Sequence, residues 1–219
     1  MSNNGVLIHI WMVSNSQIII SRHKIVKTML KKIFTFIAFV ALIYFILVSL
    51  QPLRYNIWYP TIQSAYPNNG LEIGIMVRDY FPKRTPENIQ FFKLTDASPL
   101  EAFRGKITQE QFQRLKKEVL SPVIIGKINY YKRLYNRARP VQVAPEIVDA
   151  LDSTTANSAA YPSGHAFQAF YAAKLLSQWE PTRKKEWEAI ADRVANIRII
   201  AGLHYPSDRD FAKRLVKGL

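Results

Sequence analysis

Residues 161–176 read YPSGHAFQAFYAAKLL, a helix start followed by an apolar run. Ser163 and Gly164 are typical of the start of a helix, and the apolar residues that follow predict a helix with a buried face. Similar helix signals dominate the sequence on both sides, whereas runs of alternating β-branched residues are scarce. The sequence therefore predicts an all-α body built as a helical bundle.

The other expected helices flank this stretch. A serine with a following proline or a threonine marks several of their starts. Expected helices begin at Ser98-Pro99, span 108–120 (with Phe112, Leu115 and Val119 on one side), run from 121 to about 140, begin again at 144–146, and span 164–179, 181–202 and 207 to near the C-terminus.

Composition limits the class of protein. The chain has 219 residues, of which 48% are hydrophobic, so one ordinary domain with a real core is expected and a wholly disordered protein is excluded. The absence of cysteine excludes disulfide scaffolds, Cys-zinc sites, iron–sulfur clusters and thiol nucleophiles. The 30 basic and 16 acidic residues give a net charge of +14, which is typical of proteins that bind nucleic acid, anionic membranes or small anions.

The N-terminal region predicts a membrane anchor. Residues 33–50 contain no charge and meet the lower bound for a bilayer-spanning helix. Three lysines between residues 27 and 32 precede them, so the positive-inside rule predicts residues 1–32 as a cytoplasmic tail and the body outside, in the periplasm if the host has two membranes. An uncleaved anchor is favoured over a cleaved signal because residues 48–51 form a poor cleavage site, and Met29 is a second candidate for the natural start.

Residues 51–82 predict a linker with irregular packing segments, because they are rich in Pro, Asn, Gly and Tyr. The helical domain is then expected over residues 83–219. Three clusters of residues in this domain carry the chemistry.

The first cluster is residues 132–140, KRLYNRARP. Lys132 and Arg139 are seven residues apart and would share one face of a continuous helix with the neighbouring Tyr131 and Tyr135. A lysine on an aromatic face needs an anion partner or a route to solvent. Because Pro140 disfavours helix at the preceding residue, Arg139 is expected at the helix end. A solvated basic face remains the alternative.

The second cluster is Ser163, Gly164 and His165. Free N–H groups at a helix N-terminus and the helix dipole favour an anion. Glycine allows a ligand to approach the backbone, the serine adds a hydroxyl donor, and the histidine adds a titratable group. The alternative is a simple serine cap with an incidental histidine.

The third cluster is residues 198–208, RIIAGLHYPSD. Arg198 lies at the edge of an apolar helix face, where a buried guanidinium needs an anion. His204 follows Gly202, at which the helix should end. Asp208 has a spacing that allows it to orient the His204 ring, although an ordinary acidic residue in the first turn of a helix is the alternative.

The order K-x6-RP, PSGH and R-x5-H-x3-D resembles the type 2 phosphatidic acid phosphatase and vanadium haloperoxidase superfamily. With one apolar span, the chain is more similar to the soluble bacterial class A nonspecific acid phosphatases than to the six-helix lipid phosphatases. The resemblance covers roughly residues 90–217 and implies a helical phosphatase domain. Two departures are Ile197, where serine is usual, and the charged Arg209-Asp210, where membrane members are usually apolar.

The resemblance also implies the role of each motif residue. His204 would be the nucleophile that forms a phosphohistidine, Asp208 would orient it, and His165 would protonate the leaving group. Cationic side chains would take the place of a metal, so no metal or cofactor is expected. The residues implied to bind the phosphoryl oxygens are Lys132, Arg139, Ser163, Gly164 and Arg198.

The function expected from the sequence is metal-independent hydrolysis of phosphomonoesters by a membrane-anchored enzyme. Its partners would be the membrane and a phosphorylated small molecule or lipid, and no nucleic acid is expected. The alternatives are a lipid phosphate or isoprenoid pyrophosphate phosphatase, a vanadate-dependent haloperoxidase, and a non-catalytic anion-binding module. The last is disfavoured because binding an anion requires the cations but not the two histidines.

Overall fold

The computed structural model describes residue 24, residues 26–46 and residues 66–219. The chain divides into two units, residues 1–47 and residues 48–219. In the first unit, Val26–Ile46 forms a helix that is long and apolar enough to cross a bilayer, by length and composition. It contains most of the expected span over 33–50, of which residues 47–50 lie outside the described part of the chain.

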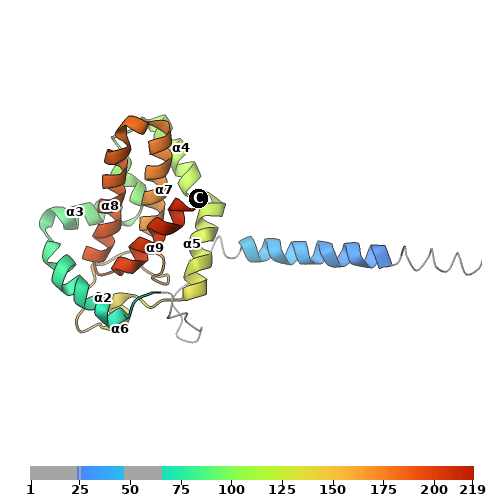
Figure 1. The fold of residues 1–219 in the computed structure, drawn as a ribbon, viewed down its shortest axis with the longest axis horizontal. Coiled ribbons are helices and arrows are strands. Elements are labelled where there is room, and N and C mark those ends of the chain that lie inside the picture. The colour runs from blue at the N-terminus through green and yellow to red at the C-terminus, as the bar shows by residue number, and fades with distance from the viewer. Residues whose placement is uncertain (1–23, 25, 47–65) are drawn as a thin grey trace, which may run out of the picture. The chain divides into compact units, whose positions relative to one another are not determined.

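In the second unit, all regular secondary structure of the described residues 66–219 is helical, and these residues contain no strand (Figure 1). This confirms the all-α prediction. In chain order, the elements are α2 (Asn69–Ile75), the π-helical η2 (Met76–Tyr80), the 3-10 helix η3 (Phe81–Lys83), α3 (Pro86–Asp96), the 3-10 helix η4 (Pro99–Phe103), α4 (Gln109–Val119), α5 (Pro122–Tyr135), α6 (Pro140–Val143), α7 (Gly164–Trp179), the 3-10 helix η5 (Pro181–Arg183), α8 (Lys184–Ile200) and α9 (Pro206–Lys217).

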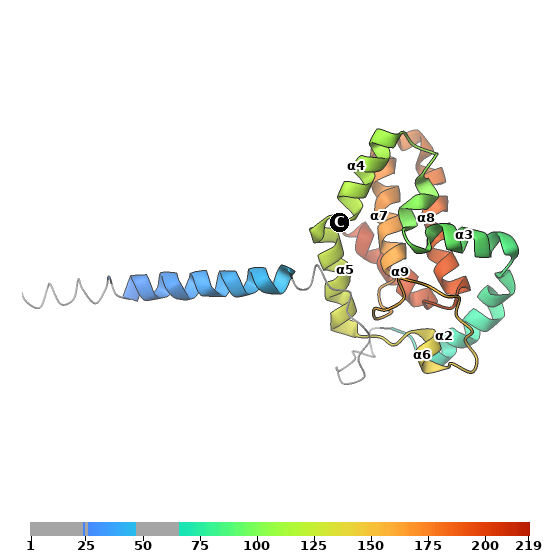
Figure 2. The same cartoon turned by 180° about the vertical axis from the view of Figure 1, so that it is seen from behind.

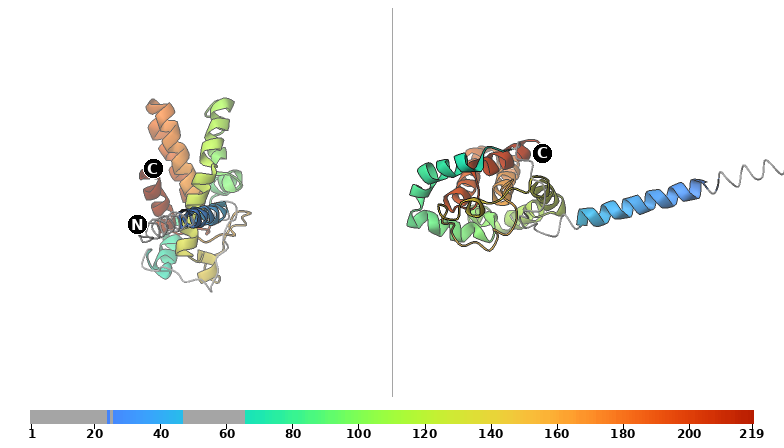
Figure 3. Two further views of the ribbon diagram at one scale, coloured as in Figure 1. Left: turned by 90° about the vertical axis from the view of Figure 1, so that its right-hand side faces the viewer. Right: turned by 90° about the horizontal axis from the view of Figure 1, so that it is seen from below.

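The centre of this unit is a hairpin of α7 and α8, which lie side by side and are joined by the short η5 (Figures 1 and 2). Alanines allow the two helices to approach closely, and the side chains of Leu176 and Trp187 are completely buried. Helix α9 packs against α7, while α4 and α5 follow one another along another side of the unit (Figure 3). Because the hairpin is antiparallel, the start of α7 and the end of α8 lie at the same end of it.

Several predicted boundaries are confirmed. Helix α7 spans the predicted residues 164–179, with Ser163 as its N-cap. Helix α4 begins after Thr108, which forms a reciprocal capping box with Gln111, and it buries the predicted apolar residues of its inner face.

Three helix predictions are wrong in extent or in type. Helix α5 ends at Tyr135 instead of near residue 140, because Asn136 adopts a left-handed conformation (φ 40°, ψ 46°) that terminates the helix. The expected helix at 144–146 is a turn, and the short helix α6 lies just before it. The expected helix after Ser98 is the 3-10 helix η4.

The expectation of an irregular segment over 51–82 is corrected for its described part. Residues 69–83 are helical, and Asn68 caps α2 by accepting hydrogen bonds from two backbone N–H groups. Ile73 and Met76 are buried in a cluster with Ile199 of α8 and Tyr205. The sequence gives only weak periodicity here because the inward face of α2 is short, and the packing brings Glu72 into the interior.

Candidate active site

The three predicted clusters meet at the end of the α7–α8 hairpin where α7 begins and α8 ends. Each cluster comes from a different part of the fold, and all but two of the predicted side chains are almost fully buried. The residues brought together are Lys132 of α5, Arg139 before α6, Ser163, Gly164 and His165 at the start of α7, Arg198 in the last turn of α8, His204 in the following loop, and Asp208 in the first turn of α9.

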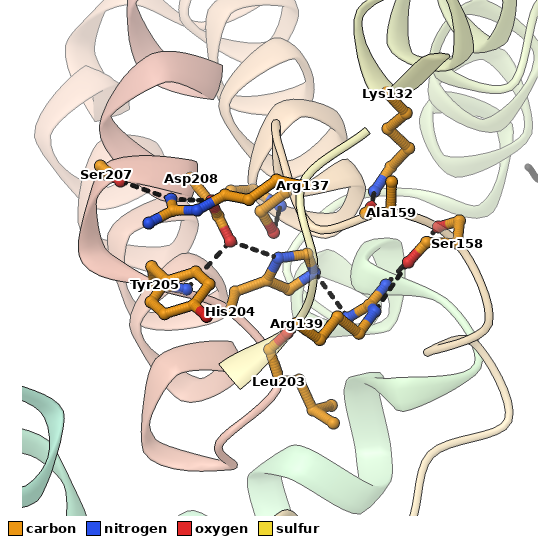
Figure 4. A network of polar contacts seen from close by, with 12 residues as sticks. Lys132, Arg137, Arg139, Ser158, Ala159, Leu203, His204, Tyr205, Ser207 and Asp208 are labelled. Carbon is orange, nitrogen blue, oxygen red and sulfur yellow. Dashed lines mark hydrogen bonds and ion pairs between the residues drawn. The ribbon is translucent and has the colours of Figure 1, made fainter. Parts of the chain in front are cut away.

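His204 is held between an acceptor and a donor. Its Nδ1 lies 3.0 Å from Asp208 Oδ2, and its Nε2 lies 3.2 Å from Arg139 Nη1 (Figure 4). A carboxylate can only accept and a guanidinium can only donate, so the proton belongs on Nδ1 and the lone pair on Nε2. This is the tautomer in which Nε2 can act as a nucleophile.

The arrangement of Lys132 and Arg139 differs from the prediction. They do not share a helix face, because Arg139 lies beyond the end of α5. The loop after Asn136 instead returns Arg139 to the site, where its Nε donates to Ser158 O at 2.7 Å and its Nη1 to Leu203 O at 2.9 Å. Lys132 points to the segment before α7 and donates to Ala159 O, next to the Ser158 carbonyl that Arg139 contacts (Figure 4). The two cations therefore converge through tertiary structure and not through helical periodicity.

The start of α7 borders the same space. Ser163 is completely buried, and its hydroxyl accepts a hydrogen bond from Ala166 N, so its own O–H is the donor that remains for an anion. A methyl group built on Gly164 would lie 3.8 Å from Lys132 Cε. The start of α7 therefore lies directly beside the lysine side chain, where its free backbone N–H groups favour an anion.

Arg198 is paired with a carboxylate that the sequence did not single out. Its Nη1 donates to Asp96 Oδ1 at 2.7 Å, and its Nη2 lies 3.2 Å from Thr155 Oγ1. The main-chain oxygen of Asp96 also contacts His165 Nε2 at 2.8 Å. No described atom accepts a hydrogen bond from Arg198 Nε, which is buried. This donor is available to a bound anion.

The crowding of positive groups changes their pKa values. Burial, with repulsion from Arg139, lowers the pKa of Lys132 well below its ordinary value. Burial and Arg198 lower the pKa of His165 to about 3, and burial and Arg139 lower that of His204. These are the directions expected where buried cations lie close together, and they favour binding of an anion that would offset the repulsion.

Asp208 shows the opposite shift. Burial raises the pKa of its carboxyl to about 6, and Arg137 partly offsets this increase.

Three charged residues near the site were not predicted. Arg137 lies in the first predicted cluster, where the sequence indicates for it only a basic face. Its side chain is completely buried, and Asp96 and Glu72 were missed as well. The ion-pair partners of all three lie 65 or more residues away along the chain, so no local pattern signals them.

The end of α8 fixes the position of His204 relative to Arg198. Gly202 has φ 79°, and a methyl group there would come within 3.1 Å of the Ala150 backbone, so glycine is required. Leu203 N donates to Arg198 O at 3.0 Å and closes the turn. The chain therefore reverses immediately after the helix and directs His204 back toward Arg139.

A cavity of about 450 Å³ adjoins the site on the side of His165 and Thr155. Its wall combines apolar and polar side chains from η4, α4 and α7. The residues that line it besides these two include Leu100, Glu101, Phe112, Lys116, Leu120 and Gln168.

Residues 119–209 match the family model of the PAP2 superfamily. This region is similar to proteins of the PAP2 superfamily. The matched region contains all eight predicted site residues, whereas Glu72 and Asp96 precede it. The match supports the superfamily resemblance over the part of the chain that contains the three motifs.

No curated protein sequence matches the chain. Among solved structures, the chain is similar to the first transmembrane PAP2 type phosphatidylglycerolphosphate phosphatase from Bacillus subtilis. The two share 16% sequence identity with a TM-score of 0.39, and the comparison covers 81% of this chain and 92% of the other.

Proposed function

We propose that this chain hydrolyses phosphate monoesters in two steps through a phosphohistidine on His204, without a metal ion. One observation supports this above the others. The contacts of Asp208 and Arg139 favour a neutral His204 whose Nε2 lone pair is directed toward a group of cations. A module that only binds anions has no need of such a tautomer.

In the first step, His204 Nε2 attacks phosphorus while the bond between phosphorus and the ester oxygen breaks. His165 donates a proton to the leaving alkoxide, and Asp208 stabilises the positive charge on His204. In the second step, water attacks phosphorus, His165 accepts its proton, and the N–P bond breaks to release phosphate.

Charge on the equatorial oxygens would be stabilised by the cations and donors around His204. Lys132, Arg139 and Arg198 would act together with the Ser163 hydroxyl and the Gly164 N–H. Arg139 now donates to Nε2, so a phosphoryl oxygen would take over this donor when the substrate binds.

For the substrate, we propose a phosphorylated membrane lipid, with the catalytic domain outside the cytoplasm. The helix Val26–Ile46 supports this, because a catalytic domain tethered to a bilayer meets lipid headgroups at high effective concentration. The cavity beside His165 would receive the alcohol part of the ester, since the proton donor must face the leaving oxygen. Leu100, Phe112 and Leu120 provide apolar surface there.

A soluble phosphomonoester is the second candidate, as the resemblance to class A acid phosphatases implies. The charged side chains of Glu101 and Lys116 at the same cavity favour it, because they suit a polar alcohol such as a sugar. The charged residues Arg209 and Asp210, which are ion-paired to one another, agree with a water-exposed domain.

The test uses the full chain in detergent and a generic aryl phosphate, with and without EDTA. Activity that survives EDTA but not the substitution His204→Ala is expected. Loss of all activity in EDTA, or full activity of His204→Ala, would overturn the mechanism. A panel of phosphatidate, prenyl pyrophosphate, sugar phosphates and nucleotides then compares the two substrate classes, and higher kcat/KM for sugar phosphates would reject the lipid proposal.

A further inference from the structure

We propose that Arg137 and Glu72 are positioning residues that hold Asp208 in the orientation and charge state that His204 requires. The inference rests on the proposed function for its catalytic meaning. Its structural basis is a buried network that joins α2, the loop after α5 and the first turn of α9.

Arg137 bridges two carboxylates. Its Nη1 donates to Asp208 Oδ1 at 2.6 Å, and its Nη2 donates to Glu72 Oε2 at 2.6 Å. Its Nε donates to Asn69 Oδ1 at 3.0 Å, and its guanidinium lies 3.7 Å from the centre of the Tyr205 ring. With 0% of its side chain exposed, this arginine is fixed on every side.

Glu72 anchors the other end of the network. Its Oε1 accepts the Ser207 N–H at 2.8 Å, and its Oε2 accepts the Ser207 hydroxyl at 2.6 Å. Ser207 precedes Asp208 in the first turn of α9. Glu72 therefore fixes both the arginine that contacts Asp208 and the backbone of the helix turn to which Asp208 belongs.

The two oxygens of Asp208 then have separate tasks. Oδ1 accepts from Arg137, whereas Oδ2 accepts from Tyr205 N at 2.9 Å and faces His204 Nδ1 at 3.0 Å. Occupation of Oδ1 leaves the carboxylate one orientation, and in that orientation Oδ2 meets the imidazole. Loss of Arg137 would free the carboxylate to rotate and would leave a buried charge without its partner.

The charges around Asp208 predict opposite effects for the two positioning residues. Arg137 lowers the pKa of Asp208 and Glu72 raises it. The other titratable groups that act on or face the carboxylate are Lys132 of α5, Arg139 before α6, Tyr161 before α7, and His204 and Tyr205 before α9. Because these remain unchanged, Arg137→Gln should raise the pKa of Asp208 and Glu72→Gln should lower it.

The experiment measures kcat and KM against pH for the full chain with an aryl phosphate. Arg137→Gln is expected to lower kcat about 10–100-fold with less change in KM, as for other groups that orient a catalytic residue, and to move the acid limb to higher pH. Glu72→Gln should move the acid limb to lower pH, and Arg137→Lys should restore part of kcat. The matched control is Arg183→Gln, which also removes an arginine held by two carboxylates, and it should leave the profile unchanged.

A second measurement is independent of activity. Nitrogen-15 NMR of labelled histidines, with His204 assigned from His204→Ala, should report a proton on Nδ1 in the wild type and loss of this tautomer in Arg137→Gln. An unchanged tautomer and acid limb in both variants would overturn the proposal. If Arg137→Gln does not fold, Glu72→Gln decides by the same two measurements. If instead wild-type activity does not depend on His204, the proposed function fails while the NMR result still decides the positioning role.

Discussion

Arg137 and Arg183 occupy opposite ends of the α7–α8 hairpin, and each bonds to two carboxylates and stacks on an aromatic ring. The two arginines differ in burial and in the origin of their partners. Arg137 is completely buried, whereas 36% of the Arg183 side chain is exposed. The same ionic pattern thus occurs once inside the candidate active site and once at the surface.

The partners of Arg183 are local. Glu180 and Glu186 lie three residues away on either side, at 2.9 and 3.0 Å, and the ring is that of Trp187. Such a group can form whenever η5 and the start of α8 form. Solvent screens its charges, so this group is expected to add little to stability.

The partners of Arg137 are distant, and the interaction is shielded from water. The bonds to Glu72 and Asp208 span 65 and 71 residues. Breaking a buried pair of this kind costs about 3–5 kcal/mol because one charge is left uncompensated. The number of ionic contacts is therefore a poor measure of the importance of an arginine. Burial and the separation of the partners along the chain distinguish the candidate active site from the other end of the hairpin.

The largest expected effect is at the active-site end. His204→Ala should reduce kcat on the order of 10⁴-fold or more, because the covalent route is lost. Phosphate transfer to the protein, trapped by rapid acid-free denaturation with a labelled substrate, should disappear with it. Retention of more than a few per cent of activity would contradict the assignment of the nucleophile.

His165→Ala should have the next largest effect, and its size should depend on the leaving group. A loss of about 10²–10⁴-fold is expected for an alkyl phosphate, because its alkoxide needs a proton. The loss should be much smaller for an aryl phosphate with an acidic phenol. Equal losses on both substrates would show that His165 does not act as the general acid.

Anion binding should draw protons into the active-site end. Burial and Arg198 hold the pKa of His165 at about 3, below its ordinary value, and a bound dianion should raise it. A pH of about 5 lies between the pKa of His165 in the free protein and its raised pKa in the complex. Sulfate binding at this pH should therefore be accompanied by the uptake of about one proton. Calorimetry in two buffers of different ionisation enthalpy measures this number, and proton release would contradict the prediction.

The smallest effect should follow from Arg183→Gln at the other end. Activity should stay within about two-fold of wild type, because a surface ion pair far from the site affects neither charge nor geometry there. Steady-state kinetics on the full chain measures it. A tenfold loss would mean that the two ends of the hairpin are coupled, and it would remove this variant as a control.

The sequence predicted the parts of the site that local rules govern. The start of α7 at Ser163 follows from capping chemistry, and the reversal after α8 follows from Gly202. Lys132 and Arg139 were predicted to meet, but for the wrong reason, since Asn136 ends the helix and a loop returns the arginine. Their roles, like those of the other motif residues, remain predictions that the variants above address.

The missed residues depend on tertiary contacts. Glu72 lies in a segment that the sequence marked as irregular, and only its packing places it beside Ser207. Asp96 ends an ordinary helix, and nothing near it in the chain signals a bond to Arg198. Distant partners of this kind cannot be predicted from the sequence spacing, because no helix or strand periodicity relates residues so far apart in the chain.

The left-handed turn at Gly202 gives the motif R-x5-H a geometric meaning. Between Arg198 and His204, the chain completes the last turn of a helix, reverses at a glycine and closes on the Arg198 carbonyl. The five residues between Arg198 and His204 are therefore the number needed to end the helix and reverse the chain, and backbone hydrogen bonds set this number. Side chains within the gap can be exchanged if they pack, but a one-residue insertion there would separate the arginine and the histidine as surely as removing either one.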